Sequence, residues 1–64
     1  MRVNGEEKNL SGENTLKDFL VREGYDITRI AVEKNGGIIP KADFESEMLD
    51  ENDRLEIVTF VGGG

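Results

Sequence analysis

Cysteine and histidine are both absent from this 64-residue chain. Their absence excludes disulfide bonds, thiolate nucleophiles, imidazole bases and the usual zinc ligands. A chain of this length buries only about 60% of the surface that it exposes when unfolded, so we expect one small domain with little room for an internal active site. Such a domain must depend on regular packing between sheet and helix. An enzyme is therefore the least favoured class of protein.

The chain has few basic residues. Eight Lys and Arg residues stand against fourteen Asp and Glu residues, which gives a net charge of −6. Nucleic acid is therefore an unfavourable partner, because its phosphates would be repelled. Half of the acidic residues lie between Asp43 and Glu56, where Arg54 is the only basic residue. This acidic segment is either a solvated surface or a region that steers a basic protein partner toward the chain.

Long apolar runs are missing as well. No stretch approaches the roughly 20 residues of a membrane span, and the amino terminus lacks the apolar segment of a signal peptide. We expect no membrane contact and a cytoplasmic location, which also suits a chain without cysteine.

The apolar residues that are present indicate one main helix. They recur at helical spacing over residues 16–23. Thr15 has a hydroxyl that can accept from the free N–H groups of the first turn, and Asp18 follows at the spacing of a capping box. Gly24 is placed where a left-handed residue commonly ends a helix. The sequence therefore predicts a capped helix over residues 16–23.

Alternating apolar and polar residues predict five strands. The first is followed by Asn4-Gly5, a strong hairpin signal, and Pro40 restricts the fourth to an edge. The first and last strands have the clearest core patterns, so we expect them to be adjacent and parallel at the centre of the sheet. Residues 41–52 are irregular apart from one helical turn expected near residues 42–44. The predicted strands span residues 1–4, 7–11, 27–33, 38–39 and 54–61.

This order of elements favours an α+β fold. One amphipathic helix on one face of a mixed, four- to five-stranded sheet is the economical way to bury these apolar residues. The arrangement is a roll of the β-grasp, or ubiquitin-like, kind. We divide the chain into a β-grasp domain over residues 1–61 and a flexible carboxyl-terminal glycine tail over residues 62–64.

Three glycines, Gly62, Gly63 and Gly64, end the sequence. Ordering glycine costs more backbone entropy than ordering any other residue, but a chain without Cβ atoms can thread a narrow channel. We expect Gly62 and Gly63 to enter a partner's active site and to present the Gly64 carboxylate there. Adenylation by ATP would give this carboxylate a good leaving group, and a persulfide could then replace AMP to leave a thiocarboxylate. The alternative is a frayed terminus without function.

Four stretches resemble the ubiquitin-like sulfur carriers, and within them the ThiS family of thiamine biosynthesis. Together they span nearly the whole chain, and their order and spacing are more specific than any one of them. They are Met1-Arg2-Val3-Asn4-Gly5, Thr15-Leu16-Lys17-Asp18-Phe19-Leu20, the hairpin from Ile30 to Lys41 with Asn35-Gly36 and Ile38-Ile39-Pro40, and Asp53-Arg54-Leu55-Glu56-Ile57-Val58 with the terminal glycines.

This resemblance implies a function and a set of partners. An E1-like adenylyltransferase of the ThiF type would adenylate Gly64 with Mg-ATP, while the carrier itself would bind no cofactor and no metal. Sulfur would come from a cysteine persulfide. The Gly64 thiocarboxylate would then deliver it to a ThiG-type thiazole synthase that forms the thiazole ring of thiamine.

Strand alternation also suggests where such partners dock. If Leu55 and Ile57 face the helix, Val58 and Phe60 face the opposite side of the sheet, beside the small Ala31 of the neighbouring strand. Adjacent exposed apolar residues indicate a protein contact more strongly than isolated ones. The alternative is that residues 41–52 cover Val58 and Phe60.

Other functions stay open at this point. The same fold could carry sulfur for another pathway, such as molybdopterin synthesis, although those carriers tend to be longer. It could be a ubiquitin-like modifier that is conjugated to proteins through Gly64. It could also be a plain binding module whose tail does nothing.

Overall fold

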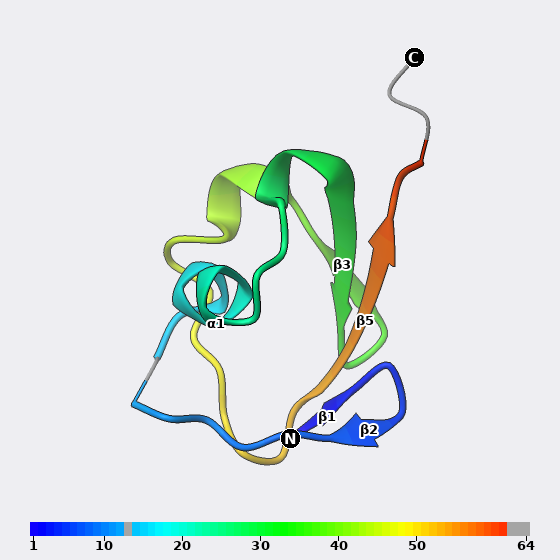
Figure 1. Cartoon of the computed structure of the whole chain (residues 1–64). Helices are drawn as coiled ribbons and strands as arrows, with labels where there is room; N and C mark the ends of the chain where they lie inside the picture. The colour runs from blue at the N-terminus through cyan, green and yellow to red at the C-terminus, as the bar shows by residue number, and fades with distance from the viewer. Residues whose placement is uncertain (13, 62–64) are drawn as a thin grey trace.

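A five-stranded sheet with one α-helix packed against it forms the framework of the protein (Figure 1). The computed structural model describes residues 1–12 and 14–61. The helix α1 spans Leu16–Arg22, and two 3₁₀ turns, η1 and η2, span Ile27–Arg29 and Lys41–Asp43. The strands are β1 (Arg2–Val3), β2 (Glu6–Glu7), β3 (Ile30–Lys34), β4 (Gly37–Ile39) and β5 (Arg54–Thr59).

The last strand occupies the centre of the sheet. The strand order is β2-β1-β5-β3-β4, with β1 parallel to β5 and every other pair antiparallel. Val3 is in register with Leu55, and Val32 with Ile57. The predicted mixed sheet, with its first and last strands adjacent and parallel, is therefore confirmed, as is the place of β4 at an edge.

Asn4 supports β5 beyond the end of the short strand β1. Its side-chain amide donates to the Ile57 carbonyl oxygen over 3.2 Å, and the Ile57 N–H donates to Asn4 Oδ1 over 2.7 Å. Asn4 itself has a φ of 52° and begins the turn into Gly5. One side chain thus satisfies both backbone groups of a residue that β1 is too short to reach.

The helix begins at the predicted residue, Leu16, and ends at Arg22, one residue before the predicted end. The Asp18 N–H donates to Thr15 Oγ1 over 3.2 Å, and the backbone N–H of Glu23 closes the last turn on the Phe19 carbonyl. Gly24 follows with a φ of 83°, a conformation that glycine adopts without strain. The buried side of α1 consists of Leu16, Phe19 and Leu20.

Residues 44–49 pack on the same face of the sheet as the helix. Phe44 and Leu49 are buried in the core cluster. The backbone N–H groups of Leu16 and Lys17 donate to the carbonyls of Glu47 and Phe44. The core is therefore a single layer between the sheet and the helix with its neighbouring loop, and it consists of Met1, Val3, Leu16, Phe19, Leu20, Ile30, Val32, Phe44, Leu49, Leu55 and Ile57.

Lys34 ties β3 to this loop. Its ammonium group donates to Glu47 Oε2 over 2.7 Å and to the Met48 carbonyl over 2.8 Å, and Asp53 Oδ2 lies 3.8 Å away. The hydrogen bond with Glu47 raises the pKa of Lys34 above its ordinary value. The charge of Lys34 is therefore directed toward the loop.

Most strand boundaries differ from prediction, several by one residue and three by two or more. Residues 27–29 form η1 instead of the start of β3, because the Asp26 carboxylate accepts from both the N–H and the hydroxyl of Thr28 and so favours a turn. These hydrogen bonds lower the pKa of Asp26. The second strand is Glu6–Glu7 rather than 7–11, since β1 offers it only two residues. The last strand ends at Thr59 rather than at residue 61.

We predict that Asn4→Ala lowers the free energy of unfolding by about 2–3 kcal/mol, because it removes two hydrogen bonds and places a Cβ-bearing residue without a local partner at positive φ. Asn4→Gly loses the same hydrogen bonds without the backbone strain, so it should be about 1 kcal/mol more stable than Asn4→Ala. Urea denaturation of the three proteins measures both differences. Two variants as stable as the parent would show that the Asn4 amide does not support β5.

Candidate docking face

The sheet face opposite the helix has exposed apolar side chains at the end of β5. Val58 and Phe60 are 58% and 54% exposed, while Leu55 and Ile57 on the other face are buried. Ala31 is exposed and lies directly opposite Val58 in the β3–β5 register. The predicted exposure of these residues is therefore confirmed, and residues 41–52 do not cover them because that segment packs on the helix side.

Phe60 is held in line with β5 although the strand ends one residue earlier. Its backbone N–H donates to the Arg29 carbonyl over 2.7 Å, which continues the pairing toward β3. Val61, the last described residue, is 94% exposed. Pairing with the sheet thus holds the backbone as far as Phe60, two residues before Gly62.

Ile38 extends this face toward the edge strand. It is 75% exposed and lies opposite Glu33 in the β3–β4 register, so its side chain shares the face of Glu33 and Ala31. Sequence analysis did not assign Ile38 to the docking site. Side chains alternate along a strand, and Ile39 packs against the core. This alternation could have predicted that Ile38 lies on the opposite, exposed face.

We call this surface the open face. It consists of the outward side chains of Arg2, Ala31, Glu33, Ile38, Arg54, Glu56, Val58 and Phe60.

The predicted carrier residues Gly62, Gly63 and Gly64 lie outside the described residues. Their roles, and the division into a domain of residues 1–61 and a tail of residues 62–64, stay predictions. Within residues 1–12 and 14–61, no group of three or more Asp and Glu side chains is arranged to hold a metal ion. In the same residues, no helix is long and apolar enough to cross a membrane.

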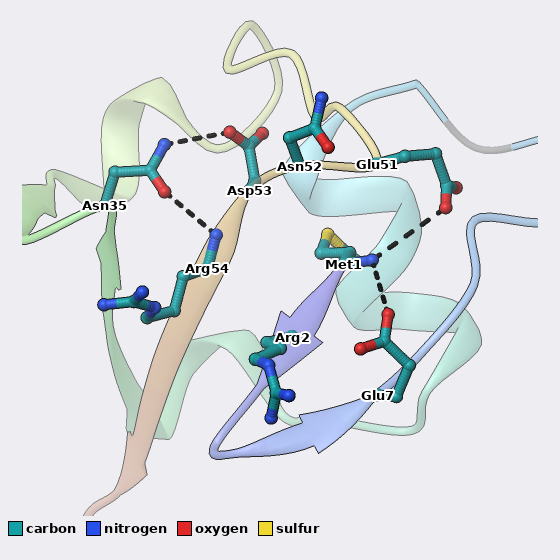
Figure 2. Close-up of a pocket in the computed structure, with 8 residues that line it drawn as sticks. All are labelled: Met1, Arg2, Glu7, Asn35, Glu51, Asn52, Asp53 and Arg54. Atoms are coloured by element: carbon teal, nitrogen blue, oxygen red, sulfur yellow. Dashed lines mark hydrogen bonds and ion pairs between the residues drawn. The ribbon is translucent and has the colours of Figure 1, made fainter.

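A polar pocket lies at the opposite end of β5, beside Arg54 (Figure 2). It has a cavity volume of about 340 Å³. The amino-terminal ammonium group donates to Glu7 over 3.2 Å and lies 3.9 Å from Glu51. No sequence pattern predicted this pocket, which is lined by Met1, Arg2, Glu7, Asn35, Glu51, Asn52, Asp53 and Arg54.

The carboxylates of this pocket stabilise local structure. Asp53 accepts from the Asn35 side-chain amide over 2.9 Å and from the Asp50 N–H over 2.8 Å, and so closes the turn before β5. Glu7 and Glu51 neutralise the amino terminus, as Figure 2 shows. The carboxylates of the pocket therefore lie close together because they stabilise the turn before β5 and the amino terminus.

Comparison with known proteins assigns the chain to a family. The model of the ThiS family matches residues 1–64, the full length of the sequence. The chain belongs to the ThiS family. The match includes the region of the open face and the three glycines that follow it.

Two relatives of this ThiS-family chain are much longer proteins. A thiazole synthase of Paramagnetospirillum magneticum is 42% identical over 62 residues, which are 97% of this chain and 19% of that protein. A thiazole synthase of Magnetococcus marinus is 33% identical over 64 residues, which are 20% of its length. The chain thus spans about a fifth of these two proteins.

Other relatives match this ThiS-family chain in size. An uncharacterized protein, ycf40, of Pyropia yezoensis is 38% identical over all 64 residues and 90% of its own length. The crystal structure of the thiamine biosynthesis protein ThiS from Geobacter metallireducens has a TM-score of 0.78 at 24% identity and covers 98% of this chain and 96% of that one. This structural match confirms the β-grasp fold.

We predict that Phe60→Glu changes the free energy of unfolding by less than about 1 kcal/mol, since the Phe60 side chain already lies half in water. The control Ile57→Glu buries a charge on the core face of the same strand and should cost more than about 4 kcal/mol. Urea denaturation compares the two variants. A loss for Phe60→Glu near that of Ile57→Glu would contradict the exposure of this side chain.

Proposed function

We propose that the chain is a sulfur carrier for thiazole formation in thiamine biosynthesis and that it works in the cytoplasm. The carboxylate of Gly64 is adenylated and converted to a thiocarboxylate. The family match over all 64 residues is the observation on which this proposal rests. The open face, which lies at the end of β5 that leads to the glycines, supports it.

The proposed chemistry takes place in three steps. The Gly64 carboxylate attacks the α-phosphorus of Mg-ATP in the active site of the partner, and pyrophosphate leaves. A cysteine persulfide then attacks the carbonyl carbon, and AMP leaves with the bonding electrons. A second thiol cleaves the resulting S–S bond, which leaves a thiocarboxylate on Gly64 and a disulfide on the donor. The carrier contributes the reacting carboxylate, and its partners contribute the catalytic groups.

The open face and the glycines have separate tasks in this proposal. Ala31, Val58 and Phe60 form the apolar contact with a ThiF-type adenylyltransferase. Gly62 and Gly63 pass through a channel that side chains would block, so that Gly64 reaches the nucleotide. Binding energy from the remote face thereby positions the reacting group.

A ThiG-type thiazole synthase is the proposed acceptor of the sulfur. Two proteins named thiazole synthase contain a region that matches nearly all of this chain within one longer polypeptide. A covalent connection gives two modules a high effective concentration, which is advantageous when one must deliver a group to the other. This arrangement in the relatives supports thiazole synthase as the partner of the separate chain.

Intact-mass analysis of the chain from its native host tests the proposal. We predict a species in which one carboxylate oxygen is replaced by sulfur, and fragmentation that places the sulfur on Gly64. The matched control is a strain that lacks the ThiF-type adenylyltransferase, in which this sulfur-containing species should be absent. A chain that ends elsewhere or never contains sulfur would overturn the carrier proposal, and a ladder of lysine conjugates through Gly64 would identify a protein modifier instead.

Removal of Gly63 and Gly64 tests the role of the tail. We predict that the truncated chain unfolds at the same urea concentration as the full chain, because every core residue lies within residues 1–57. It should not be adenylated when incubated with the adenylyltransferase and radiolabelled ATP. Gly63→Ala, which retains the length and adds one Cβ, should be adenylated more slowly than the parent. Normal adenylation of the truncated chain would contradict the proposal.

A further inference from the structure

Two glutamates face each other at the centre of the open face. Glu33 of β3 and Glu56 of β5 are directly opposite in the antiparallel register, and both are exposed. Side chains at such positions project to the same side with Cβ atoms roughly 5 Å apart, and like charges there destabilise the strand pair. The isolated domain therefore has an unfavourable like-charge pair between β3 and β5.

Cations of the neighbouring strands form no ion pair with these two glutamates in the described part of the chain. Lys34 is directed to the loop by Glu47, and Arg2 donates to the Gly5 carbonyl. Within residues 1–12 and 14–61, neither Glu33 nor Glu56 forms an ion pair, even with Arg54 on the same side of β5. Arg54 is the next outward residue of β5 and lies opposite Arg2 of β1, so two arginines border one side of the glutamates. The two carboxylates are exposed and can accept from a partner.

Apolar side chains flank the glutamates. Val58 and Ala31 form the next outward pair along β3 and β5 toward the glycines, and Ile38 lies opposite Glu33 on the far side. The apolar groups can desolvate a charged contact at the centre, where an ion pair is stronger than it is in water.

We propose that Glu33 and Glu56 form the electrostatic centre of the docking face and bind an arginine or lysine of the activating partner. This inference rests on the proposed function and specifies the chemistry of the partner surface, which is a basic side chain with apolar groups on the sides that meet Ile38 and the Ala31–Val58 pair. An arginine guanidinium has enough donors to bind both carboxylates at once. In the free domain the two carboxylates repel each other, and a bound basic side chain of the partner would neutralise this repulsion.

The proposal predicts that binding and stability respond in opposite directions to one substitution. Glu33→Lys replaces a like-charge pair with an opposite-charge pair across the strands, so the free domain should melt about 2–4 °C higher than the parent. The same change places a positive charge against the partner's basic residue. Its dissociation constant for the purified ThiF-type adenylyltransferase should rise at least about tenfold at low salt, and the ratio should shrink as salt is added.

Glu6→Lys is the matched control. It changes the net charge by the same amount, but Glu6 lies on β2, opposite Val3 and away from the open face. Its dissociation constant should stay within about threefold of the parent, since only long-range steering is altered. Calorimetric titration at two salt concentrations and thermal unfolding of the three proteins provide all the measurements.

The outcomes separate this inference from the function on which it rests. If the parent is adenylated but binds no more tightly than Glu33→Lys, the inference is wrong and the carrier proposal stands. Equal weakening by Glu33→Lys and Glu6→Lys would reduce the effect to net charge and also overturn it. If the adenylyltransferase neither binds nor modifies the parent, the carrier proposal fails, and this inference fails with it.

Discussion

A single helix can cover only one face of a sheet, and the architecture of this protein follows from that constraint. The loop between η2 and β5 could have shielded the second face, but Phe44 and Leu49 draw it into the core beside α1. The other face is left in water with Val58, Phe60 and Ile38 on it. In a domain with so small a core, the face that folding does not use is the face available for binding.

The central position of β5 connects this free face to the chemistry at the end of the chain. Strands flank β5 on both sides, and Asn4 replaces β1 where that strand stops. The backbone of Phe60 is still held by Arg29 after the last strand residue. A partner that docks on the open face therefore meets the carboxyl-terminal segment at a defined place, which is what positioning a reactive group requires.

The sequence predicted those parts of the structure in which local chemistry and tertiary packing agree. Thr15 and Gly24 end the helix by local hydrogen bonds and backbone conformation, so its start was predicted correctly and its end to within one residue. Ile27 and Thr28 have β-branched side chains, which favour a strand. The Asp26 carboxylate instead accepts hydrogen bonds from Thr28, and residues 27–29 form a 3₁₀ turn. The Glu33–Glu56 contact could not be predicted, since it depends on the β3–β5 register, which no local pattern specifies.

The most direct test of the account is to locate the partner on the carrier. Amide resonances of the ¹⁵N-labelled chain should be followed while unlabelled adenylyltransferase and Mg-ATP are added. We expect the largest changes at Ala31, Glu33, Val58 and Phe60 and in residues 62–64, with the helix α1 almost unchanged. Changes concentrated on α1, with the open face and the glycines unaffected, would contradict the account.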